Sequence, residues 1–141
     1  MRRATADPKH PGMKRLVLLV VCLAAASCGG GLERASFSAD GVTFAHGERV
    51  GLTLTNVTQG QLKVNLCLSQ LISADGKTTG PSEAASCDSL EPSPLEASKS
   101  VNARKSIPAS LPAGRWRYET TITLPNEKTE KVLTQEFDVT N

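Results

Sequence analysis

An apolar segment near the N-terminus most constrains what this chain can fold into, because it decides which residues remain in the mature protein. The basic pair Lys14 and Arg15 precedes an apolar run at residues 16–26. This run is too short to cross a bilayer, which takes about 20 apolar residues, and its basic and small-residue flanks are typical of a secretory signal. We therefore expect residues 1–27 to be an N-terminal extension and signal peptide that is removed.

The residues that follow the run resemble the lipobox of bacterial lipoproteins. Small residues lead into a cysteine and a glycine, in the order Leu23-Ala-Ala-Ala-Ser27-Cys28-Gly29. The resemblance implies that Cys28 becomes the acylated first residue and that the protein is anchored in the cell envelope. Glycine beside the cysteine is similar to lipoproteins of an outer membrane, facing the periplasm, if the cell is Gram-negative. An ordinary signal peptide and a buried helix are the alternatives.

Residues 1–12 have no apolar period and contain turn-forming residues such as Pro8 and Pro11. Such a stretch is unusual in front of a signal, so we predict that translation starts at Met13. A long basic region starting at Met1 is the alternative. Either way, we expect this stretch to be absent from the mature chain.

Removal of the signal changes the charge of the protein. Five of the 16 basic residues and one of the 14 acidic residues precede Cys28. The mature chain therefore has a net charge of about −2, and its formal charge of +2 belongs to the precursor. A net negative domain without a basic stripe argues against binding to a phosphate backbone, so we expect no nucleic-acid partner.

Removal of the signal also leaves two cysteines for the folded domain. Cys22 lies in the apolar run and Cys28 would carry lipid, so Cys67 and Cys87 remain. In an oxidising envelope these two form one structural disulfide, whereas in a cytosol they would be candidates for metal binding or redox chemistry. A disulfide that closes a loop of this length contributes about 3 kcal/mol to stability in the chain-entropy estimate.

The rest of the mature chain alternates apolar and polar residues in short segments, which predicts β-strands. We expect a flexible tether at residues 28–36, which includes three consecutive glycines, and one folded domain at residues 37–141. A first strand or hairpin is expected at residues 36–44, and further strands at residues 49–55, 61–70, 101–107, 115–124 and 133–139.

The segment at residues 61–70 shows the cleanest alternation, with Leu62, Val64, Leu66 and Leu68 on one face. This phase turns Cys67 away from the core. Its partner is then a covering loop and not the opposite sheet. The segment Lys77–Ser100 is rich in Ser, Pro and Glu, and we expect it to be a long surface loop pinned by Cys87. Such a loop is either functional or an ordinary connection.

Six or seven strands with regular turns and no helical period predict an all-β fold, a single antiparallel Ig-like β-sandwich of about seven strands. The segments Gly47-Glu-Arg-Val-Gly-Leu-Thr-Leu-Thr-Asn56 and Leu111-Pro-Ala-Gly-Arg-Trp-Arg-Tyr118 are similar to motifs in Ig-like domains of small bacterial lipoproteins and in intracellular-proteinase-inhibitor-like modules. The resemblance implies this fold and little about activity. Trp116 is then expected to be a core residue.

The residues needed for catalysis or metal binding do not form a recognisable pattern. His46 is the one histidine after Cys28, and the sequence has no G-x-S-x-G motif to supply a nucleophile. The acidic residues of the long loop lack the spacing of calcium-binding loops. We therefore expect no enzyme, no cofactor and no metal site.

These observations predict a lipid-anchored cell-envelope protein with a non-catalytic binding or structural domain. The alternatives are a proteinase-inhibitor-like module that presents the Lys77–Ser100 loop and a hydrolase that uses His46. A protein partner is expected to dock beside that loop or to add a strand to a sheet edge. Arg115 and Arg117, beside Arg104, form either a contact for an anionic partner or a solvated sheet face.

Overall fold

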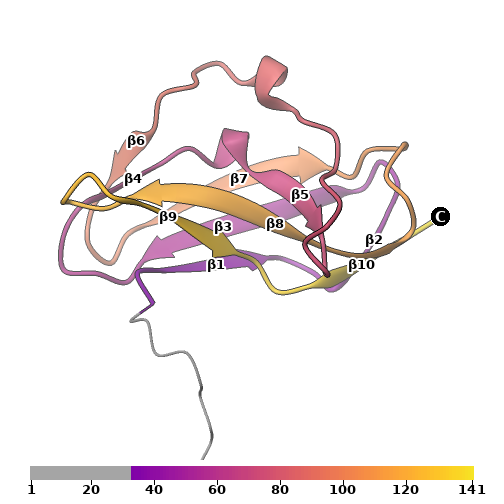
Figure 1. Cartoon of the computed structure of the whole chain (residues 1–141), viewed down its shortest axis with the longest axis horizontal. Coiled ribbons are helices and arrows are strands. Elements are labelled where there is room, and N and C mark those ends of the chain that lie inside the picture. Colours follow the sequence, from indigo (N-terminus) through magenta and orange to yellow (C-terminus); the bar gives the residue numbers. More distant parts are fainter. Residues whose placement is uncertain (1–32) are drawn as a thin grey trace, which may run out of the picture. The chain divides into compact units, whose positions relative to one another are not determined.

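Two β-sheets lie face to face in the computed structural model, which describes residues 33–141 (Figure 1). The smaller sheet has the order β1-β3-β7, formed by Ala35–Ala39, Arg49–Asn56 and Ser100–Ser106. The larger sheet is built around β8, Gly114–Thr123, with β4 (Leu62–Val64) and β5 (Gln70–Ser73) on one side and β9 (Thr129–Leu133) and β10 (Phe137–Thr140) on the other. Short strands β2 (Thr43–Ala45) and β6 (Ser93–Leu95) form its edges. The predicted all-β Ig-like sandwich is confirmed.

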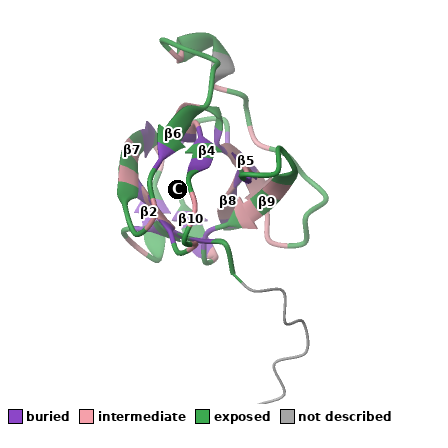
Figure 2. Cartoon of the chain, turned by 90° about the vertical axis from the view of Figure 1, so that its left-hand side faces the viewer, coloured by how far each residue is buried: buried purple, intermediate pink, exposed green. Residues whose placement is uncertain are grey.

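The core lies between the two sheets and follows the predicted alternation (Figure 2). Strand β3 contributes three residues without exposed surface, Val50, Leu52 and Leu54. On β8, Trp116 and Tyr118 are buried, and the Tyr118 ring lies 5.8 Å from the ring of Phe137. Burying each such side chain stabilises the fold by about 2 kcal/mol, because its apolar surface is removed from water. Trp116 is therefore a core residue, as predicted.

The first predicted segment is divided between the two sheets and is not a hairpin. Strand β1 pairs with β3, whereas β2 pairs in parallel with β10 in the larger sheet. The chain changes sheet at Asp40, whose backbone N–H donates to Gly51 O (2.9 Å) and whose side chain accepts from the Gly51 N–H (2.9 Å). These two hydrogen bonds end the pairing of β1 with β3.

The prediction of one strand at residues 61–70 is wrong. Strand β4 ends at Val64, and the 3₁₀ helix η1, Leu66–Leu68, separates it from β5. Val64 pairs with Ile122 and Gln70 with Glu119, so five residues of this segment lie opposite two residues of β8. Leu68, which the alternation places in the core, is 40% exposed.

The predicted last strand is also interrupted. Leu133 pairs with Glu119 and Phe137 pairs with Trp116, so three residues lie opposite two. This is a β-bulge, in which one strand carries an extra residue. Thr134 fills the gap in the ladder, because its hydroxyl accepts from the Tyr118 N–H (3.0 Å) and its N–H donates to Tyr118 O (2.9 Å).

The predicted signal peptide, the start at Met13 and the lipidated Cys28 lie outside the described residues, so they stay predictions. The same holds for the tether up to residue 32. Across residues 33–141, no helix has the length and apolar character needed to cross a membrane.

Candidate functional site

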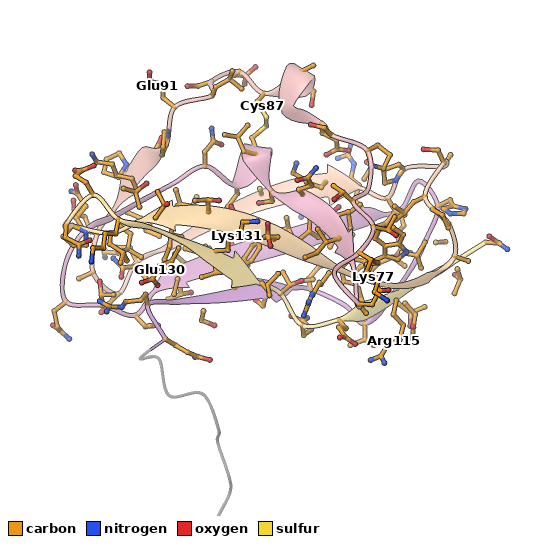
Figure 3. The ribbon with its side chains drawn as sticks, viewed as in Figure 1. Lys77, Cys87, Glu91, Arg115, Glu130 and Lys131 are labelled. Carbon is orange, nitrogen blue, oxygen red and sulfur yellow. A yellow bond between two sulfur atoms is a disulfide. The ribbon has the colours of Figure 1, made fainter. Side chains whose placement is uncertain are left out.

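The most distinctive surface feature is the segment at residues 77–99, which we call the pinned loop. Its cysteine forms the predicted disulfide with Cys67, with the two Cα atoms 5.8 Å apart. Cys87 and Glu91 lie on the arch of chain above the two sheets (Figure 3). Within this predicted surface loop lie two short elements, the 3₁₀ helix η2, Ala84–Ser86, and strand β6. Leu95 on β6 is buried, whereas Leu90 is 63% exposed.

A buried lysine makes a second attachment of this loop. The side chain of Lys105 on β7 is only 5% exposed, and its ammonium lies 3.2 Å from the carboxylate of Glu83. The ammonium also donates to Cys67 O (2.6 Å) and Ser69 O (3.0 Å). Because η1 separates β4 from β5 and interrupts the pairing of this segment with β8, these carbonyls have no strand partner, and the lysine supplies the donor that they need.

Tyr118 lies close to this polar cluster on the core side. Burial, and then the charge of the nearby Glu83 carboxylate, raise the pKa of the Tyr118 phenol. Its hydroxyl is buried and has no hydrogen-bond partner among the described residues. A phenol with a raised pKa stays neutral at physiological pH, so Tyr118 is suited to packing and not to proton transfer.

Asn65 fixes the part of the pinned loop that carries the exposed leucine. Its side-chain oxygen accepts from the Cys67 N–H (3.0 Å), which caps η1. Its side-chain N–H₂ donates to Ser89 O (2.8 Å) and Glu91 O (3.2 Å). These carbonyls stand on either side of Leu90, so one asparagine holds the backbone on both sides of an exposed apolar side chain.

A neutral groove lies between the pinned loop and β8 and β9. It has a volume of about 290 Å³. Its walls combine apolar and hydroxyl groups and include no charged side chain. They are formed by Asn65, Leu68, Pro92, Thr120, Thr121, Thr123 and Thr129. Such a lining suits an uncharged chain segment and offers nothing to neutralise a charged ligand.

The predicted arginine cluster is not assembled as expected. Arg115 and Arg117 lie on β8, but Arg104 lies on β7 in the other sheet, so it is not beside them. Arg115 forms an ion pair with Glu136. Arg117 is half-buried, and its Nε has no hydrogen-bond partner among the described residues. The three arginines therefore do not form one anion-binding surface.

His46 does not belong to a catalytic arrangement in the structure. Its Nε2 lies 2.7 Å from the backbone carbonyl oxygen of Leu111, so this nitrogen is engaged in a structural hydrogen bond. No serine or cysteine is among its hydrogen-bond partners in residues 33–141. Within the same residues, no group of three or more His, Cys, Asp or Glu side chains is arranged to hold a metal ion.

The sequence predicted the disulfide but not the attachments of the loop by Lys105 and Asn65. Lys105 occupies an inward-facing position of β7, in phase with Val101 and Ala103. A lysine in the apolar phase of a strand was a signal for a buried polar contact. Nothing in the sequence pairs this residue with Glu83, or Asn65 with Ser89 and Glu91, because these contacts join segments that only the tertiary fold brings together.

No protein-family model and no curated protein matches the sequence. Among solved structures, the chain is similar to a Salmonella enterica SafA pilin in complex with the SafB chaperone, with 13% identity, a TM-score of 0.52 and coverage of 77% of this chain and 55% of that one. It is also similar to the Escherichia coli chaperone DraB, with 17% identity, a TM-score of 0.50 and coverage of 74% and 53%. The chain spans about half the length of these proteins. At such identities the similarity shows the Ig-like β-sandwich fold alone.

Proposed function

We propose that this chain is a lipid-anchored cell-envelope protein whose β-sandwich binds a protein partner, without catalysis, through the pinned loop. Acyl chains on Cys28 hold it at the membrane, and more than one chain is needed for stable anchoring. In a Gram-negative cell this places it in the outer membrane, facing the periplasm. The Cys67–Cys87 disulfide supports an oxidising compartment of this kind.

One observation carries this proposal: Leu90 is 63% exposed on backbone that is held in place. The pinned loop is attached by the disulfide, by the Lys105–Glu83 ion pair and by Asn65. A segment ordered before binding loses less conformational freedom in the complex, which favours affinity. An apolar side chain presented in this way is suited to fill a pocket of a protein partner.

The similar solved structures support a binding role in a more general way. One is a chaperone and the other is a pilin in complex with a chaperone, so β-sandwiches of this kind take part in protein–protein contacts. The similarity does not extend to a partner for this chain. The proposal therefore depends on the loop geometry and not on the relatives.

A photo-crosslinking amino acid at position 90, introduced in the native host, tests the proposal. We expect light-dependent crosslinks from position 90 to an envelope protein. The matched control is position 42, where Val42 is 69% exposed outside the pinned loop. Crosslinks of equal yield from both positions, or none from position 90, would contradict binding through the loop.

A proteinase-inhibitor-like module is the second candidate, and the position of Asn65 favours it. An inhibitory loop must sit in a protease cleft like a substrate while its backbone stays fixed. Asn65 holds the carbonyls before and after Leu90, which leaves this side chain free to enter an apolar specificity pocket.

A panel of serine proteases with apolar specificity pockets tests this second candidate. We expect inhibition at micromolar protein that is lost in Leu90→Gly and kept in the control Val42→Gly. No inhibition by the disulfide-bonded protein at that concentration would remove the candidate and leave the broader binding proposal in place.

A further inference from the structure

The free edge of β7 is a second surface with binding capacity, on the smaller sheet. The strand ends the sheet order β1-β3-β7, and its inward residues pair in register with β3, as in Ala103↔Leu52 and Val101↔Leu54. The hydrogen bond from the Ile107 N–H to Glu48 O (2.9 Å) shows which residues of β7 direct their backbone groups toward β3. Alternate residues therefore point their N–H and C=O groups away from β3, namely Ser100, Asn102, Arg104 and Ser106. No described residue hydrogen-bonds to these backbone groups.

The opposite edge of the same sheet, on β1, differs from β7 in two ways: its backbone is capped at Ala39, and its inward residues are buried. The side-chain amide of Gln135 donates to Ala39 O (2.7 Å) and accepts from the Ala39 N–H (3.2 Å). The inward residues of β1, including Phe37, are all buried. On β7, by contrast, Val101 and Ala103 face the core and remain only half-buried. The sandwich therefore lacks cover beside β7, at its margin in Figure 2.

An added strand would supply that cover. In a strand that pairs with β7, alternate side chains point inward, where they would pack against Val101 and Ala103. The remaining side chains would lie on the outer face beside Arg104. Two edge strands of the larger sheet, β2 and β6, are less suitable, because they have only three residues each and β6 contains Pro94.

The charge along β7 indicates which partner fits. Lys99 precedes the strand, Arg104 is exposed on its outer face, and Arg49 on β3 lies opposite Ser106. None of these three basic side chains forms an ion pair with a described carboxylate. The strand contains no acidic residue. Acidic side chains on the outer face of an added strand would therefore meet complementary charge.

We propose that the free edge of β7 binds an extended segment of a partner protein, in which acidic residues alternate with small apolar ones, as a fourth strand of the smaller sheet. This surface is separate from the pinned loop, so the inference goes beyond the proposed function and does not depend on it. Main-chain hydrogen bonds give the affinity, and the basic outer face with the half-buried inward residues selects the sequence.

The test uses two synthetic seven-residue peptides, one that alternates Glu with Val and one that alternates Lys with Val, and the full chain in detergent. Asn102→Pro removes a central outward N–H without removing a bond to β3. Asn102→Ala is the matched control, because it loses the same Thr53–Asn102 side-chain bond (2.7 Å) and keeps the N–H. We expect the Glu peptide to bind wild type and Asn102→Ala, and to bind Asn102→Pro about tenfold or more weakly, a loss of about 1.4 kcal/mol.

Charge reversal gives an independent measurement if Asn102→Pro does not fold. Arg104→Glu is expected to weaken the Glu peptide and strengthen the Lys peptide. Equal binding of the Glu peptide to Asn102→Pro and Asn102→Ala, an unchanged peptide preference in Arg104→Glu, or no binding of either peptide would overturn the proposal. A wild-type dimer that Asn102→Pro abolishes would also overturn it, in favour of a second copy of the chain. None of these results changes the crosslinking outcome at position 90.

Discussion

Lys105 and Glu83 form an ion pair of 3.2 Å between a core-facing position of β7 and the pinned loop. The lysine side chain is almost fully buried, whereas the glutamate side chain is about one-third exposed. The same ammonium donates to two carbonyls that the interruption at η1 leaves without strand partners. One side chain thus completes the hydrogen bonding of the larger sheet and attaches the loop to the smaller one.

We expect Lys105→Met to destabilise the domain by about 1–3 kcal/mol, because it leaves the part-buried carbonyl of Cys67 and the buried carbonyl of Ser69 without a donor. Glu83→Gln is expected to cost less, about 0–1 kcal/mol, since this side chain is partly exposed to water. Denaturant unfolding followed by the fluorescence of the single tryptophan measures both. A Lys105→Met variant as stable as wild type would show that the carbonyls do not need the lysine. Equal costs for the two variants would assign the loss to the ion pair with Glu83 and not to the carbonyls.

Removing the disulfide should make the pinned loop more mobile without unfolding the sandwich. The bond joins residues 20 positions apart, and its loss in the double variant Cys67→Ser and Cys87→Ser is expected to cost about 3 kcal/mol. Because the core residues lie between the sheets and all of them except Leu95 are outside this loop, the variant should still unfold cooperatively, with new protease cleavage confined to residues 77–99. Cleavage spread over the strands would instead make the disulfide a condition for folding.

Asn65→Asp is a nearly isosteric change that separates the two roles of this residue. The carboxylate can still accept from the Cys67 N–H but can no longer donate to Ser89 O and Glu91 O. We expect faster amide hydrogen exchange around Leu90 and unchanged exchange in β3, together with weaker crosslinking from position 90. Unchanged exchange around Leu90 would mean that the disulfide alone orders this segment.

The single tyrosine gives a spectroscopic test of the buried cluster. The raised pKa of Tyr118 means that the folded state favours the neutral phenol, whereas the unfolded chain ionises near pH 10. Its contribution to stability is therefore complete below about pH 10 and is lost as pH rises through the folded pKa. Phenolate absorbance should be absent from folded protein just above pH 10 and should appear together with unfolding.

Tyr118→Phe is the matched variant for this titration. It removes a buried hydroxyl that has no hydrogen-bond partner in the described residues, so stability at neutral pH should stay equal or rise. The variant should also unfold at higher pH than wild type. Reversible phenolate formation near pH 10 without unfolding would show that the hydroxyl is accessible to water.

The sequence predicts the strands whose alternation continues without interruption. β3 and β8 follow the pattern from end to end, since each inward residue meets the opposite sheet. The segment from Leu62 to Leu68 shows the same period but does not form one strand, because Asn65 caps a 3₁₀ turn and leaves Leu68 exposed. The periodicity shows which residues are apolar. It does not show where a side chain takes the place of a neighbouring strand as the hydrogen-bond partner of the backbone.

The candidate site was predictable only in outline. The cysteine count and compartment gave the Cys67–Cys87 bond, and the composition gave a surface loop between the strands. The attachments by Lys105 and Asn65 depend on contacts between distant segments, so no local pattern contains them. The exposure of Leu90 likewise depends on how the loop lies over the sheets.

The intact mass of the protein purified from membranes of its own host, before and after reduction, tests the central claim most directly. The account predicts a chain that begins at an acylated Cys28 and gains about two hydrogens when one disulfide is reduced. An unacylated chain that begins at Met1 or Met13 and carries free thiols would contradict the envelope location. Cys67 and Cys87 would then have to be considered as redox or metal-binding residues.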